Sequence, residues 1–98
     1  MEPADGGDEE FNEWYRKQHL DMLAMVKGFR RSTRYKRVDN EAPRFVALHE
    51  YDTTDLPVEQ VKLVTGTEWS KKIIGGAKAF EVDVWEFINA YGDTPSKI

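Results

Sequence analysis

The amino-acid sequence predicts a single α+β domain in which helices cover one face of an antiparallel sheet. Three observations predict this class. An amphipathic helix pattern spans Asp8–Val26, two adjacent β patterns follow at Phe29–Val38 and Arg44–Tyr51, and another β pattern spans Phe80–Tyr91 after a helical region. A chain of 98 residues has room for one hydrophobic core, so we treat residues 1–98 as one domain.

The first predicted helix follows a polar lead-in at residues 1–7. Asp8 is placed to cap it, and Glu9 and Glu10 put negative charge in the first turn, where the helix dipole favours it. At about 100° per residue, one arc gathers the larger side chains: Phe11, Trp14, Tyr15, His19, Met22, Leu23, Met25 and Val26. Gly28 suits the left-handed conformation that commonly ends a helix.

Two strands are predicted next, on either side of the turn-like segment 39–43. In the second strand, alternation puts Phe45, Ala47, His49 and Tyr51 on one face. Val46 and Leu48 lie on the other face, so both faces are largely apolar. This pattern predicts a central strand that is covered on both sides.

The remaining chain predicts two short helices and a final strand. Pro57 opens the first helix and Gly66 interrupts it, after which Thr67 caps the second. The order helix, strand, strand, helix, strand is a ferredoxin-like β-α-β-β-α-β unit without its first strand. Either a short stub before Asp5 supplies that strand, or the chain begins further upstream.

Composition excludes several classes of function. Without cysteine there are no disulfides or thiolate metal sites, which fits a cytoplasmic protein, and no His-x-x-x-His spacing suggests a metal. There is no signal peptide and no apolar run of roughly 18 residues, so we expect no membrane partner. A net charge of −4 argues against nucleic acid, although the strand at 29–38 is rich in arginine.

Four linked segments resemble a known family: Asp8–His19 (DEEFNEWYRKQH), Gly28–Tyr35 (GFRRSTRY), Ala47–Glu50 (ALHE) and Thr67–Trp69 (TEW). Together they are similar to the EthD-like family of dimeric α+β barrels, particularly its fungal members. The resemblance covers nearly the whole chain, from about Pro3 to Gly92, and departs from the family at the absent first strand.

The resemblance implies a homodimer in which two four-stranded sheets close into a barrel, with a pocket for a small organic molecule between sheet and helices. The absent first strand, together with the tandem units of many fungal relatives, also leaves open a truncated protomer or one half of a tandem protein. Related folds include polyketide cyclases, cofactor-free monooxygenases, a hydroxynitrile lyase and haem-degrading enzymes. The fold therefore leaves the reaction open.

His19 and His49 are the candidate catalytic bases, because an imidazole that titrates near neutrality can accept a proton inside an apolar pocket. The simpler interpretation of each is a core histidine hydrogen-bonded to a backbone carbonyl. Tyr35 is the third candidate, since a phenol can stabilise an enolate. Its alternative is an aromatic residue at the rim.

Aromatic side chains are the candidate substrate-binding residues, because they would line a flat pocket: Tyr15, Phe45, Trp69 and Trp85. Arg34 is a candidate for binding a carboxylate ligand, although a salt bridge within the protein or to a partner is the stronger expectation. No cofactor-binding pattern is present.

The leading functional hypothesis is a cofactor-independent lyase, cyclase or dehydratase that acts on a small carbonyl-containing aromatic or polyketide-like compound. In this hypothesis His19 abstracts a proton, and Tyr35 and His49 position or stabilise the enolate. One alternative is a dimeric ligand-binding or stress-associated protein without catalysis. Another is a cofactor-free monooxygenase.

Overall fold

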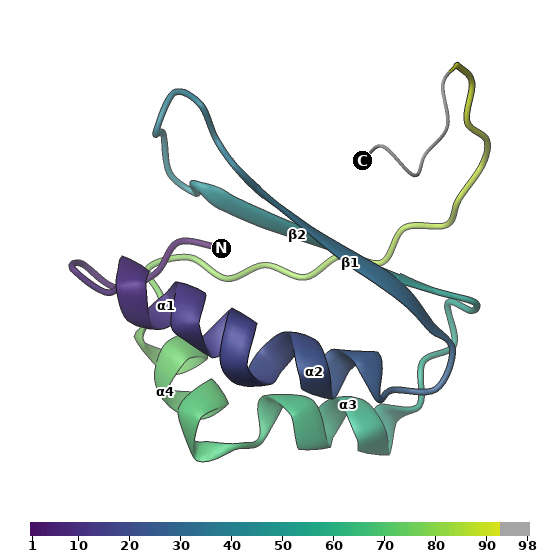
Figure 1. Ribbon diagram of the computed structural model, residues 1–98, viewed down its shortest axis with the longest axis horizontal. Coiled ribbons are helices and arrows are strands. Elements are labelled where there is room, and N and C mark those ends of the chain that lie inside the picture. Colours follow the sequence, from purple (N-terminus) through teal and green to yellow (C-terminus); the bar gives the residue numbers. More distant parts are fainter. Residues whose placement is uncertain (93–98) are drawn as a thin grey trace.

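The computed structural model describes residues 1–92. Its first element is a helical rod made of three consecutive segments (Figure 1). These are helix α1 (Asp8–Trp14), a π-helical turn η1 (Tyr15–His19) and helix α2 (Leu20–Ala24). The predicted helix is confirmed, and Gly28 adopts a φ of 90° just beyond it. The predicted cap is wrong: Gly7 is the N-cap, because both carboxylate oxygens of Asp8 bind Arg44 instead.

The strands β1 (Phe29–Lys36) and β2 (Phe45–Tyr51) form an antiparallel hairpin. Its register pairs Ser32 with His49 and Tyr35 with Val46. In β2 the residues from Phe45 to Tyr51 alternate between half-buried and exposed, so only one face is covered. The prediction of a strand covered on both sides is therefore wrong within residues 1–92, because the helices pack on one face alone.

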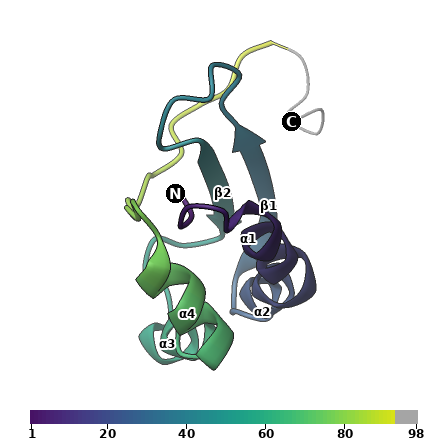
Figure 2. The ribbon, with the colours of Figure 1, turned by 90° about the vertical axis from the view of Figure 1, so that its left-hand side faces the viewer.

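Helices α3 (Val58–Thr65) and α4 (Glu68–Gly76) follow, as the sequence predicts, and lie beside the first helical rod (Figure 2). Thr67 caps α4, and its hydroxyl accepts a hydrogen bond from the Ser70 N–H at 3.0 Å. Gly66 ends α3 where the chain turns sharply. A Cβ at this position would lie 2.7 Å from the Lys62 carbonyl oxygen, so the corner requires glycine.

Two clusters form the core. The first is aromatic and joins the helical rod to β2 and α4: Phe11, Trp14 and Tyr15, packed against Phe45, Ala47, Trp69, Ile73 and Ile74. The second joins α2 to α3: Leu23, Val26 and Val64, packed against Met22 and Tyr51. The aromatic cluster lies between the helices and the hairpin, where the family resemblance implies the pocket.

The N-terminus forms a stub of strand between β2 and the segment after α4. The Met1 ammonium group and the Phe45 carbonyl are hydrogen-bonded, and Glu2 exchanges backbone bonds with Ala79. Of the two sequence-based alternatives for the first strand, the stub is present. Arg44 holds it in place through Glu2 and Asp8, at 2.8 and 2.7 Å, and lowers the pKa of both carboxyls.

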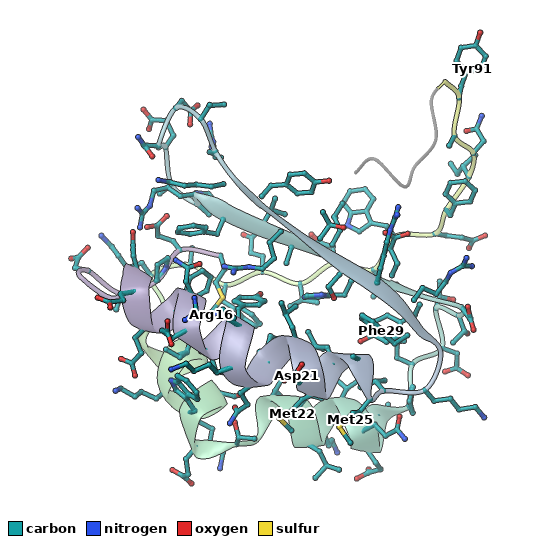
Figure 3. All side chains as sticks on the ribbon, in the orientation of Figure 1. Arg16, Asp21, Met22, Met25, Phe29 and Tyr91 are labelled. Carbon is teal, nitrogen blue, oxygen red and sulfur yellow. The ribbon has the colours of Figure 1, made fainter. Side chains whose placement is uncertain are left out.

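The predicted strand at Phe80–Tyr91 is not formed. These residues are extended and exposed, and Tyr91 projects away near the outer end of the segment (Figure 3). The reason is register: antiparallel pairing of Glu2 with Ala79 carries residues 80–91 past the N-terminal end of the stub, where no other described strand lies alongside. Within residues 1–92, no helix has the length and apolar character that a membrane span requires.

We predict that replacing Gly66 with alanine lowers the free energy of unfolding by about 1 to 3 kcal/mol, because the new methyl group overlaps the Lys62 carbonyl. The matched control is Gly75→Ala in α4, where an added Cβ meets nothing within 4 Å and helix propensity favours alanine. Urea denaturation of the two variants and the wild type measures the difference. Equal stability of the two variants would contradict this account of the α3–α4 corner.

Candidate active site

The site begins with the π-helical turn, which brings Trp14 and His19 face to face. Their ring centroids are 4.0 Å apart and their planes differ by 20°. Residues five apart do not share a face of a regular α-helix, whereas the i→i+5 bonds of a π turn bring them together. The sequence places His19 at the flank of the buried arc, and the π turn moves it onto the indole.

Trp14 itself is anchored by the α3–α4 corner. Its indole Nε1–H donates to the Ser70 hydroxyl oxygen at 3.1 Å, and that hydroxyl donates to the Val64 carbonyl at 3.0 Å. Trp14 and Ser70 are both fully buried. The indole is therefore a fixed platform for the His19 ring.

The His19 imidazole is buried, with only 6% of its surface exposed, and its Nδ1 has no hydrogen-bond partner among the described residues. Burial first, and then the neighbouring His49 and Arg34, together lower the pKa of His19 to about 4. His19 is therefore neutral at physiological pH. The sequence-based alternative, a core histidine satisfied by a backbone carbonyl, does not describe this Nδ1.

His49 reaches the same place from β2. Its ring centroid lies 6.2 Å from that of His19, at 82° to it. The Ser32 hydroxyl, directly across the hairpin, is 2.7 Å from Nδ1 of His49 and fixes the ring orientation. Burial lowers the pKa of His49, and the charge of Arg34 adds to this effect. Two neutral imidazoles thus meet edge to face between helix and sheet.

Arg34 is the cation of the site. Its guanidinium carbon lies 4.0 Å from the centroid of the Tyr15 ring, and its Nη2 donates to Oδ1 of Asn12 at 2.7 Å. The expected salt bridge is absent within residues 1–92, because Arg34 faces the aromatic part of α1 and η1 and not its acidic side. Burial lowers the pKa of this guanidinium.

The structure brings some of the predicted site residues together and separates others. His19, His49, Tyr15 and Arg34 converge, and Phe45 and Trp69 border them in the aromatic cluster. Tyr35 lies on the other face of the hairpin, opposite Val46, with 41% of its surface exposed. Trp85 belongs to the extended segment and is 80% exposed.

Sequence reasoning missed Ser32 and Asn12. Ser32 shares its strand parity with Arg34 and faces the strand that carries His49, so alternation alone indicates its position. Asn12 has no comparable signal, because it interrupts the apolar arc. Within the described part of the chain, no three His, Asp or Glu side chains come together as metal ligands would.

The arrangement can accept a proton and stabilise negative charge. A neutral imidazole is a proton acceptor, and an adjacent guanidinium favours an anion that forms when a proton leaves. Comparison with protein-family models, curated proteins and solved structures found no significant match for this chain. The chemistry of the site therefore rests on its own geometry.

We predict that the neutral state of His19 makes the protein less stable in mild acid. The unfolded chain binds the proton near pH 6.5 and the native protein only near pH 4, so stability falls as the pH drops through this window. The loss reaches about 3 kcal/mol, at 1.36 kcal/mol for each pKa unit. Urea denaturation from pH 7.5 to pH 4 measures it.

The His19→Gln variant is the control, since protonation of the carboxylates in acid changes the stability of wild type and variant equally. The unfolding free energy of the wild type minus that of the variant should fall by about 3 kcal/mol between pH 7.5 and pH 4. A difference that does not change with pH would show that His19 carries no lowered pKa.

Proposed function

We propose that this chain is a cofactor-independent lyase, cyclase or dehydratase for a small carbonyl-containing aromatic or polyketide-like compound. One observation carries the proposal: a buried imidazole, His19, is held neutral with its Nδ1 unpartnered, in the same site as a second neutral imidazole. Unpaired polar atoms are rare inside proteins and concentrate at functional sites. The aromatic side chains around the two rings suit a planar ligand.

In the proposed reaction, Nδ1 of His19 removes a proton from the carbon next to a carbonyl group. The electron pair of the broken C–H bond moves to the carbonyl oxygen and forms an enolate. His49, oriented by Ser32, hydrogen-bonds and positions the substrate. The enolate-stabilising role proposed for Tyr35 does not fit its place on the other face of the hairpin.

We predict that the protein catalyses exchange of the α-hydrogens of an aromatic ketone for deuterium. The probe is 1-tetralone in D2O at pH 7, followed by proton NMR. His19→Gln should lower the enzymatic exchange rate by about 100-fold, which is typical of losing a general base. His49→Gln should cause a smaller loss, because His49 only positions the substrate.

The matched control is Tyr35→Phe, which changes an exposed residue on the other face and should keep the wild-type exchange rate. Saturable binding of the ketone without exchange above the protein-free rate would contradict catalysis and favour the ligand-binding alternative. Full exchange by His19→Gln would show that another group is the base.

We also propose that the protein acts as a homodimer of the α+β-barrel type. The open face of the hairpin carries apolar side chains, with Leu48 47% exposed, and a sheet of two strands is marginal by itself. The extended segment 80–91 adds seven large exposed residues: Phe80, Val82, Val84, Trp85, Phe87, Ile88 and Tyr91. A second copy would cover both.

The spacing of apolar residues in the segment 80–91 suits a partner that covers both faces of this segment. Phe80, Val82 and Val84 alternate with acidic residues, whereas Trp85 and Phe87 continue the alternation on the opposite parity. A single strand would therefore turn one apolar set to each of its faces.

The cytoplasmic location stays a prediction from the sequence.

We predict a dimer at micromolar concentration by sedimentation velocity. Leu48→Asp on the open face of β2 should shift it to monomer, because a desolvated carboxylate opposes association. The matched control is Val58→Asp, the same kind of change at an exposed position of α3, which should remain dimeric. A monomeric wild type, or equal association of the two variants, would contradict the proposed interface.

A further inference from the structure

Arg34 differs from every other arginine of the chain. Each of the others forms an ion pair with a carboxylate in the described residues: Arg16, Arg30, Arg31, Arg37 and Arg44. Arg34 alone is held by an amide oxygen and an aromatic ring. A half-buried cation without a counter-charge is costly, so its position calls for an explanation.

Within residues 1–92, the contacts of Arg34 fix the guanidinium and leave some of its N–H donors without an acceptor. Asn12 accepts from Nη2, and one flat face lies over Tyr15. A guanidinium has five N–H donors in a fork that matches a carboxylate. Nδ1 of His19, more than nine-tenths buried and without a partner in residues 1–92, belongs to the same group of side chains.

We propose that Arg34 is the anchor for a carboxylate on the ligand, so that the substrate is an aromatic or polyketide-like carboxylic acid that also bears a carbonyl group. This inference rests on the proposed site and deepens it. The carboxylate of the ligand supplies the negative charge that no described residue of the protein places beside Arg34. The carboxylate then fixes one end of the molecule, and the carbonyl end lies toward the two imidazoles.

Anion binding at Arg34 also strengthens the proposed base. The charge of Arg34 lowers the pKa of both His19 and His49. A bound carboxylate offsets that charge, so the pKa of each imidazole rises when the ligand is in place. The site becomes a better proton acceptor only when an acidic ligand occupies it.

The test compares two probes of equal shape, 2-naphthoate and 2-naphthamide, by isothermal titration calorimetry on the full chain at pH 7. We expect wild type to bind naphthoate at least about 10-fold more tightly, as a charge-assisted hydrogen bond implies. Arg34→Gln should remove this preference and leave naphthamide binding unchanged. Arg34→Lys should keep part of it, because the charge remains without the fork.

The matched control is Arg31→Gln, which removes the same charge from the same strand where Arg31 pairs with Glu50, and should retain the full preference. The proposal is overturned if wild type shows no preference for naphthoate, if naphthoate does not bind at millimolar concentration, or if Arg34→Gln and Arg31→Gln bind it equally. His19→Gln should keep the preference while losing exchange of 1-tetralone. The two proposals therefore fail separately.

Discussion

The anchored indole of Trp14 is the interaction on which the rest of this structure depends. It is buried where the helical rod, the α3–α4 corner and the hairpin meet, and the hydroxyl of Ser70 fixes its orientation. Ser70 is itself held by the Val64 carbonyl across the corner at Gly66. A buried polar network of this kind is strong when every member is satisfied, and here it makes one rigid wall for the site.

Rigidity has a chemical consequence for the imidazole that stacks on this wall. His19 is stacked on Trp14 and buried, so it stays neutral, and its Nδ1 has no partner within residues 1–92. A base with a low pKa is always deprotonated at neutral pH but is intrinsically weak. The charge of the nearby Arg34 lowers the pKa of His19 and His49 further. In the proposed function, a ligand with negative charge would offset this effect, so binding and base strength would be coupled through one guanidinium.

The sheet is the incomplete part of the fold. Arg44, Glu2 and Asp8 tie the N-terminal stub to β2, and the single bridge from Glu2 to Ala79 continues the lateral order. Beyond that bridge, residues 80–91 expose apolar side chains and unpaired backbone, which are the features of an edge open to another strand. Within residues 1–92 the helices share two buried clusters, whereas the sheet consists of two strands and leaves Val46 and Leu48 exposed.

Local patterns in the sequence determined the helices, the hairpin, the Gly66 break and the Thr67 cap, because spacing and turn residues act over a few positions. Strand alternation also puts the neighbouring residues Arg34 and Tyr35 on opposite faces of their strand. Alternation could not say which face of the hairpin the helices cover, since that depends on packing between distant segments. Tertiary structure decided this, and it placed Arg34 in the site and Tyr35 outside it. The π turn at Tyr15–His19 likewise appears only in the structure, because the helix pattern of the sequence runs through it without a break. The absence of a strand at residues 80–91 does so as well, because it follows from the register of Ala79 with Glu2, which no single segment encodes.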